Sequence, residues 1–306
     1  MTTLGRGEVY AALAAMSYGS AYVATAFALR SFAAIPTAAD RSVLAALVLV
    51  AIVAVQRRGG ATPPGTPDAA VAAKTRLWHL FILGLLGGAI FLAGQSLAVA
   101  HVGATIAAFV AGLYAVLAAV ISPFVLGERL GQRALVGFLL ALVGTVLLAE
   151  LDVASADLVG IGWGLAAATA FAFFLVLGRK WSRSDGLDGV TIALATVTVA
   201  APALAVLGAA SGSTTFLPAT IAPEAAFAMA WLVVVAAGGQ ALTASSVRLI
   251  PASRSAAFLL LNPITATILA VLLLGERPTP LQLTGGGLVL LGIAAATIRR
   301  SRPNPG

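Results

Sequence analysis

The sequence contains no cysteine, only two histidines, and few charged residues, which make up 9% of the chain. The missing thiol excludes disulfides, thiolate catalysis and cysteine-ligated metals. Soluble domains carry about 25% charged residues, whereas here 60% of the residues are apolar and the mean hydropathy is +1.03. Because a soluble fold could not bury that much apolar surface, the composition indicates a polytopic membrane protein.

The apolar residues form long runs without the alternation that a spanning strand requires. A spanning helix needs about 20 mostly apolar residues. We therefore predict an all-α bundle with ten transmembrane helices, at 9–29, 37–55, 78–99, 102–126, 134–149, 158–178, 189–209, 225–247, 252–274 and 281–298.

The basic residues support this helix count. If the N-terminus is cytoplasmic and each segment crosses once, 15 of the 18 Lys and Arg residues fall on the cytoplasmic side, and only Arg30, Arg41 and Arg277 fall outside. Such a bias is typical of inner-membrane proteins and predicts that both termini are cytoplasmic. The net charge of +7 reflects these scattered loop residues, so we expect no nucleic-acid partner.

The chain repeats itself at a shift of 148 residues. Positions 126–144 and 274–292 are identical at nine of nineteen places, including Gly-Glu-Arg at 127–129 and 275–277. This predicts two five-helix repeats, 1–150 and 151–306. Since five is odd, the second repeat enters from the opposite side of the membrane, which is the architecture of alternating-access transporters.

The Gly-Glu-Arg turns themselves favour a structural role. Gly127 and Gly275 are placed to end helices in the left-handed conformation, and the charges that follow would clamp the connection to the next helix. The glycine pairs 84/88 and 160/164 have the spacing of close helix packing.

These motifs, with Asn262-Pro263 in the ninth segment, resemble those of the drug/metabolite transporter superfamily and its EamA-type exporters. Ala115 departs from the pattern, because the repeat predicts a proline there. The resemblance covers the whole chain. It implies export of metabolites or drugs, with amino acids as the first candidate, and a cavity lined by the first, third, fourth, sixth, eighth and ninth helices.

The predicted spans contain almost no charge, which limits both mechanism and substrate. All acidic residues, Asp40 among them, are expected at helix ends, so no residue is placed to carry a proton and we predict a uniporter or exchanger. The spans contain neither a basic cluster that would bind a polyanion nor a group of carboxylates that would bind a dication. The expected substrate is therefore a neutral or zwitterionic small molecule. Arg41 has two interpretations: it snorkels to the outer surface, or it lies at the cavity mouth and meets an anionic group.

Polar and aromatic residues within the spans are the candidates for substrate binding. Gln95 and Gln240 occupy corresponding stretches of the two repeats, although each is also suited to join helices by a hydrogen bond. The predicted substrate-binding residues are Tyr18, Tyr22, Gln95, Tyr114, Trp163, Phe171, Gln240 and Asn262.

Other classes of function fit less well. An intramembrane enzyme needs a nucleophile with its base, a carboxylate pair or a metal site, and none is evident. A scaffold would not explain the repeat, and a channel would need a filter or charged ring. We therefore expect no cofactor or metal, a monomer, and a lipid bilayer and a small molecule as partners. The resemblance, with the lack of organelle-targeting features, implies a place in the bacterial inner membrane. The alternative substrate is a lipophilic drug or quaternary ammonium compound, held by aromatic faces.

Overall fold

The structure is a computed structural model that describes residues 5–57, 69–127, 157–212, 220–250 and 261–297, with a few isolated residues at 136–147, 218 and 255–259. Within these ranges every regular element is a helix and no strand occurs. The prediction of an all-helical fold is therefore confirmed for the described residues. Most of the predicted segment 134–149 and the beginning of 252–274 lie outside the described residues.

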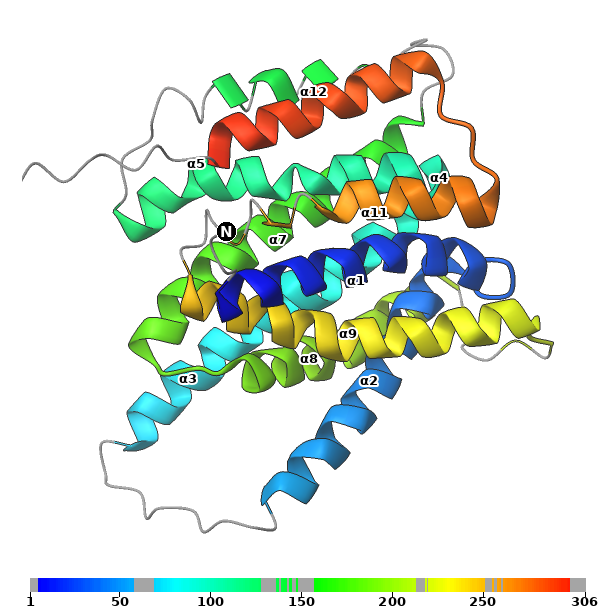
Figure 1. Cartoon of the computed structure of the whole chain (residues 1–306). Coiled ribbons are helices and arrows are strands. Elements are labelled where there is room, and N and C mark those ends of the chain that lie inside the picture. Colours follow the sequence, from blue (N-terminus) through cyan, green and yellow to red (C-terminus); the bar gives the residue numbers. More distant parts are fainter. Residues whose placement is uncertain are drawn as a thin grey trace, which may run out of the picture.

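The helices form one bundle in which most axes run in a common direction (Figure 1). Segments η1 and η2 are π-helical continuations of the α-helices before them. In chain order the elements are α1 (Arg6–Ala28), α2 (Ala34–Arg57), α3 (Ala69–Gly84), η1 (Leu85–Ile90), α4 (Phe91–Gly112), α5 (Tyr114–Leu126), α7 (Leu158–Ser184), α8 (Gly189–Ala210), α9 (Pro223–Leu249), α11 (Leu261–Leu269), η2 (Ala270–Leu274) and α12 (Pro280–Thr297).

Six of the helical stretches are long and apolar enough to cross a membrane. One of them, Lys74–Leu126, has 53 residues, more than twice what a bilayer needs. Gly103 interrupts this stretch with φ 76° and ψ 173°, a conformation that costs glycine little. The chain therefore breaks next to the boundary that we predicted between residues 99 and 102.

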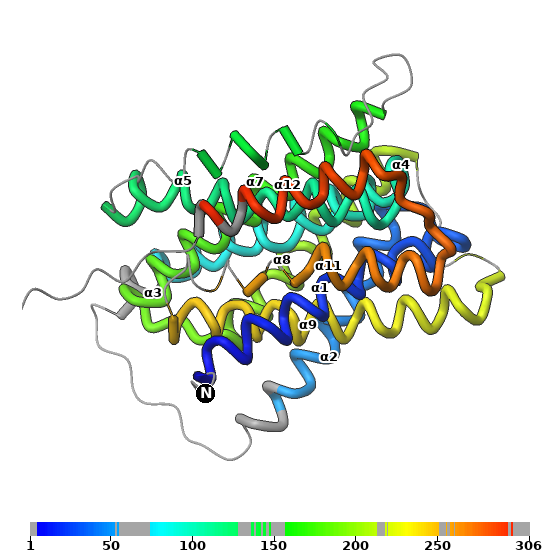
Figure 2. Tube along the Cα trace, turned by 45° about the horizontal axis from the view of Figure 1, so that its top comes forward, coloured from blue at the N-terminus to red at the C-terminus, as the bar shows by residue number. Residues whose placement is uncertain are grey.

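Helix packing follows the internal repeat. The most extensive contacts are those of α1 with α9 and of α4 with α7. At a shift of 148 residues, α1 corresponds to α7, and α9 corresponds to the stretch from α3 to α4, so these two contacts are equivalent in the two repeats. The contacts of α1 with α11 and of α5 with α7 are equivalent in the same way. In the trace of Figure 2, α12 runs close to α5, which it contacts, and α1 contacts both α9 and α11.

The two Gly-Glu-Arg turns begin as predicted. Gly127 ends α5 at φ 70°, and Gly275 ends η2 at φ 69°. Both are left-handed, a conformation that glycine adopts without steric strain.

Close helix packing at the predicted glycine pairs is also confirmed. A Cβ atom on Gly84 would lie 2.6 Å from Val199 Cβ and 2.7 Å from the Ala195 carbonyl oxygen. In the second pair, Cβ atoms on Gly160 and Gly164 would clash with side chains of α4. These glycines let neighbouring backbones approach, as membrane helices often require.

We predict that Gly84→Ala destabilises the bundle, because neither the Ala195 backbone nor the β-branched Val199 can yield without moving α8. Overpacking of this kind costs about 1–3 kcal/mol. The measurement is the thermal unfolding midpoint of purified protein in detergent. Gly162→Ala in α7 is the matched control, since its Cβ would meet nothing within 4 Å. Equal midpoints for the two variants would contradict the packing described here.

Candidate functional site

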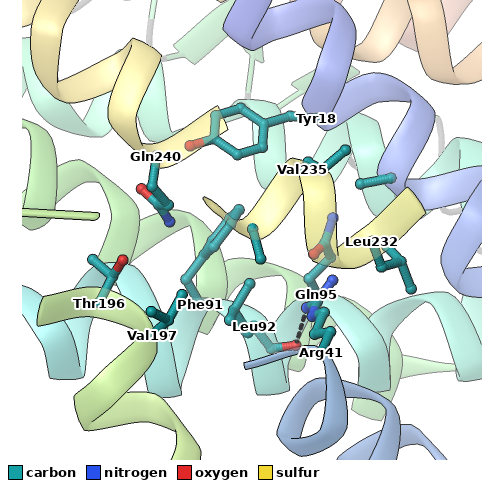
Figure 3. Close-up of a pocket in the computed structure, with 12 residues that line it drawn as sticks. Tyr18, Arg41, Phe91, Leu92, Gln95, Thr196, Val197, Leu232, Val235 and Gln240 are labelled. Atoms are coloured by element: carbon teal, nitrogen blue, oxygen red, sulfur yellow. Dashed lines mark hydrogen bonds between the residues drawn. The ribbon is translucent and has the colours of Figure 1, made fainter. Parts of the chain in front are cut away.

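A small enclosed pocket lies in the core of the bundle, between helices of both repeats (Figure 3). Its free volume is about 10 Å³, which is room for about one water molecule. The pocket is lined by Tyr18 and Ala21 of α1, Arg41 of α2, Phe91, Leu92 and Gln95 of α4, Thr196 and Val197 of α8, and Leu232, Val235, Ala236 and Gln240 of α9.

Two glutamines from the two repeats meet at this pocket. Gln95 and Gln240 are each only 2% exposed. The Gln240 amide nitrogen donates to the Gly87 carbonyl at 2.7 Å, so part of its role is to join α9 to η1. The Gln95 side chain lies beside the Tyr22 hydroxyl, whereas the Gln240 amide oxygen is buried without a hydrogen-bond partner. Because buried polar atoms are normally paired, the Gln240 oxygen is suited to bind a ligand.

The π-helical segment η1 precedes the pocket-lining residues of α4 directly. A π-turn widens the helix and is frequent at functional sites. Here Gly87 of η1 supplies the carbonyl that accepts from Gln240, and η1 is followed by Phe91 at the pocket wall. The irregular backbone therefore helps to form the site.

Arg41 lies deeper than either of its two predicted positions. It is the seventh residue after Ala34, the first residue of α2, which is about 10 Å along a helix axis. The side chain is 2% exposed, and Nη2 donates to the Leu92 carbonyl at 3.0 Å and lies 3.5 Å from Ser96 Oγ. The snorkelling interpretation is therefore wrong, and Arg41 lines the enclosed pocket instead of its mouth.

Asp40, which precedes Arg41, requires a second correction. We expected its carboxylate at the end of a helix, yet it lies within the candidate span Ala34–Ile52. One of its carboxylate oxygens is buried without a hydrogen-bond partner. Asp40 does not line the pocket, and no ion pair joins it to Arg41 among the described residues.

Aromatic rings form one wall of the pocket and extend behind it. Tyr18 and Phe91 line the pocket, and both contact Phe171, with ring centroids 5.6 and 4.5 Å away. Tyr114 packs on Phe171 at 5.0 Å and donates to the Leu259 carbonyl at 3.0 Å. Thus Phe171 and Tyr114, both predicted to bind substrate, support the lining rings from behind.

The remaining predicted residues lie elsewhere. Tyr22 and Asn262 are buried, Tyr22 beside Gln95 and Asn262 beside Tyr114, but neither is among the pocket-lining residues. Trp163 is 40% exposed, and its backbone packs on Gly94. The structure therefore does not bring Trp163 to the pocket.

The sequence pointed to α2 only through Arg41, which we expected at the cavity mouth, and sequence reasoning missed the contribution of α8. The lining helices implied by the resemblance did not include the second and seventh, yet Arg41, Thr196 and Val197 contribute to the wall. The one available signal was Arg41, because a charge within a membrane span is a functional candidate. Nothing in the sequence distinguishes Thr196 from the other threonines of its helix.

A contact between the two repeats lies at one end of the bundle. We name the end where α1 begins, at Arg6, the N-terminal end, and the end where α1 finishes, at Ala28, the far end (Figure 1). At the far end, Glu276 accepts hydrogen bonds from the backbone N–H groups of Ala104 and Thr105 at 3.2 and 3.3 Å, and from the Thr105 hydroxyl.

This Glu276 contact corrects our interpretation of the second Gly-Glu-Arg turn. We expected its charges to clamp the connection to the following helix. Instead, the carboxylate caps the helix that starts after Gly103 in the first repeat, where free N–H groups and the helix dipole favour a negative charge. The turn thus joins the two repeats at the far end. Its counterpart Glu128 lies outside the described residues.

The helix α7 packs along the stretch from α3 to α4, and a histidine and an aspartate meet at each end of this contact. At the far end His101 Nδ1 lies 2.7 Å from Asp157 Oδ2, and at the N-terminal end His79 Nδ1 lies 2.6 Å from Asp185 Oδ2. A hydrogen bond from the Gly160 N–H, and then one from His101, lower the pKa of Asp157 below its ordinary value. Burial opposes ionisation of Asp185, but hydrogen bonds from Ser184 and His79 outweigh it and lower its pKa too.

These carboxylates therefore remain ionised at neutral pH. Folding lowers the pKa of each carboxyl, so each contributes fully to stability at pH values above its unfolded-state pKa of about 3.9. This contribution is lost as the pH falls through the folded-state pKa. We expect no change in the ionisation of Asp157 or Asp185 between about pH 5 and 9.

A wider groove runs along the outside of the bundle between α1, α9 and η2. Its volume is about 430 Å³, and its lining is almost entirely apolar, with Phe227 and Leu273 strongly exposed. Such a groove suits hydrocarbon better than a zwitterion. Within the described part of the chain, no three His, Asp or Glu residues lie close enough to hold a metal ion.

The bundle of apolar helices, six stretches of which are long enough to cross a membrane, indicates a multi-pass membrane protein. Residues 5–149 and 158–298 each match the EamA-like transporter family. The chain belongs to this family, a branch of the drug/metabolite transporter superfamily. The family consists of transporters, so the predicted class is confirmed and an enzyme is excluded.

Comparison with individual proteins adds the fold. No curated protein matches the sequence. A solved crystal structure, whose title names no function, is similar with a TM-score of 0.64 and 20% sequence identity, and the match covers 97% of this chain and 99% of the other. At this identity the similarity shows a shared fold alone.

Proposed function

We propose that this transporter exports small neutral or zwitterionic metabolites, amino acids first, across the bacterial inner membrane by alternating access. The observation that carries the proposal is the buried pocket between the repeats, where Gln95 and Gln240 both contribute an amide and the Gln240 amide oxygen is unpaired. Such a pocket has the polarity of a small-molecule site, with an apolar wall and a few oriented polar groups.

The proposed topology has ten transmembrane helices in two inverted five-helix repeats, with both termini cytoplasmic and the chain functioning as a monomer. The symmetric contacts α1–α9 and α4–α7 support the repeat, and the break at Gly103 supports counting Lys74–Leu126 as two spans. The bias of basic residues supports the orientation. In this orientation the N-terminal end faces the cytoplasm and the far end faces outward.

Efflux from proteoliposomes tests the proposed substrate. Purified protein would be reconstituted and loaded with labelled phenylalanine, threonine or methionine, and efflux followed with and without a pH gradient. We expect efflux of at least one amino acid without any gradient. If folded protein releases none of the three while it releases a lipophilic quaternary ammonium compound, the amino-acid proposal is wrong and the alternative takes its place.

We propose uniport or exchange as the mode of transport, because no acidic residue lines the pocket. The intramembrane Asp40 provides the sharpest test, since Asp, Glu and His are the usual proton carriers in transporters. We predict that Asp40→Asn changes efflux less than about twofold at any imposed pH gradient, because a residue outside the pathway contributes little. Gradient-driven accumulation in the wild type that disappears in Asp40→Asn would show proton coupling instead.

A further inference from the structure

The buried cation of the pocket has no counter-ion. Arg41 is the largest of the fully buried side chains, and an arginine keeps its charge at neutral pH. Among the described residues no carboxylate lies within 4 Å of it. A buried charge without a partner strongly destabilises a fold, so a position that retains one requires an explanation.

Joining helices does not explain Arg41. The other described buried arginine, Arg179, donates to the carbonyls of Val247 and Ile250 at 3.2 and 2.8 Å, at the C-terminal end of α9. Carbonyls there lack helical partners and attract cations. Arg41 instead reaches the carbonyl of Leu92 inside α4, and its Nε remains buried without a hydrogen-bond partner.

Hydrogen-bond donors and the unpaired hydrogen-bond acceptor lie on different sides of the pocket. Figure 3 shows Arg41 and Gln95 on one side of Phe91 and Gln240 on the other. The unpaired atom on the first side is a donor, Arg41 Nε, and Gln95 lies beside the Tyr22 hydroxyl, whereas the unpaired atom of Gln240 is the amide oxygen, an acceptor. Guanidinium and amide N–H groups match a carboxylate, and an amide oxygen matches an ammonium group.

We propose that Arg41 and Gln95 bind the carboxylate of the substrate, and that Gln240 faces its ammonium group beside the rings of Tyr18 and Phe91. The proposal rests on the transport function proposed above and narrows its substrates to molecules that carry one carboxylate. The same charge repels lipophilic cations, which excludes the alternative substrate class from this pocket. Because the enclosed volume is only about 10 Å³, the lining helices must separate when a substrate enters.

Matched ligands test the proposal directly. Labelled phenylalanine efflux would be competed with phenylalanine, with phenylalaninamide, which lacks the carboxylate, and with phenylpyruvate, which lacks the ammonium group. We expect the amide to compete at least about 30-fold more weakly than phenylalanine in the wild type, as for loss of one partner of a buried charge pair. In Arg41→Gln, phenylalanine efflux should fall by a similar factor, and phenylalaninamide and phenylalanine should compete equally well.

Two further variants separate recognition from folding. Arg41→Lys keeps the charge but not the planar fork, and should retain partial efflux with the same order of competitors. Arg30→Gln removes an exposed cation that pairs with Glu224 at 3.9 Å, and should leave efflux unchanged. If the amide competes as well as phenylalanine in the wild type, or if Arg41→Gln still discriminates, the assignment of Arg41 is overturned.

The outcome also distinguishes the two proposals. Should no amino acid be transported, thermal stabilisation of the purified protein by phenylpyruvate and by phenylalaninamide would be compared. Stabilisation by phenylpyruvate alone, lost in Arg41→Gln, would support the carboxylate site while rejecting amino acids as substrates. Stabilisation by the amide, or by neither compound, would overturn the carboxylate site.

Discussion

Gln240→Met is expected to reduce amino-acid efflux by about 10- to 100-fold, and Gln95→Met by a similar factor. Methionine has nearly the shape of glutamine but no amide, so each change removes one hydrogen bond to the bound molecule, and a bond to a charged group contributes about 1.5–3 kcal/mol. The loss should appear as a higher KM for efflux, measured in proteoliposomes over a range of internal concentrations.

A structural explanation predicts a different pattern. Gln240 also joins α9 to η1 through Gly87, and interhelical bonds of this kind contribute about 0.6–1 kcal/mol. Ser246→Ala on the same helix is the matched control, because Ser246 is fully buried and bonds Ser255 at 2.9 Å but does not line the pocket. If Gln240→Met and Ser246→Ala lower the unfolding midpoint equally and neither affects KM, Gln240 serves only to join helices.

Glu276→Gln is expected to weaken the contact between the repeats at the far end. The amide keeps the size of the carboxylate but loses its charge at the start of the helix after Gly103, where Ala104 and Thr105 donate to it. Loss of such a cap costs about 0.5–2 kcal/mol. If this contact closes the outer side of the carrier, the population open to the outside should rise about two- to thirtyfold.

Hydrogen exchange at the backbone amides of 104–107 measures this change, together with labelling from the outside of a cysteine introduced at Ala21 in the pocket. Glu224→Gln is the control, since Glu224 is exposed and its pairing with Arg30 spans 3.9 Å. Exposed pairs contribute little to stability. Equal exchange and labelling in Glu276→Gln and the wild type would show that the Glu276 contact caps a helix without closing the carrier.

The helical class and the two helix ends at Gly127 and Gly275 could be predicted because they depend on local properties of the chain. Apolar runs are long enough to span a bilayer whatever their neighbours, and Gly127 and Gly275 end helices through their own left-handed conformation. Gly84 and Gly160 were recognised as packing positions by spacing alone. The family could be predicted too, because the Gly-Glu-Arg repeat survives in both halves.

The site was harder to predict because it depends on how the helices face one another. Gln95 and Gln240 were found through the repeat. Tyr114 and Phe171 were expected to line the pocket but pack behind the lining rings. This could not be predicted, because a uniformly apolar helix carries no hydrophobic pattern that shows which of its sides faces the pocket. Arg41 was placed too near the outer surface because the start of α2 was predicted three residues too late. The partner of Glu276 is 171 residues away in the chain, so no local pattern indicates it.

Labelling a single cysteine in the pocket from each side of the membrane tests alternating access most directly. The chain contains no cysteine, so Ala236→Cys provides a unique thiol at the pocket wall, and Leu272→Cys on the exposed outside of η2 serves as the lipid-facing control. A membrane-impermeant maleimide would be applied to right-side-out and inside-out vesicles. We predict that Ala236→Cys reacts from both sides, that substrate slows both reactions, and that Leu272→Cys reacts from neither. Labelling of Ala236→Cys from one side only, at every substrate concentration, would contradict alternating access at this pocket.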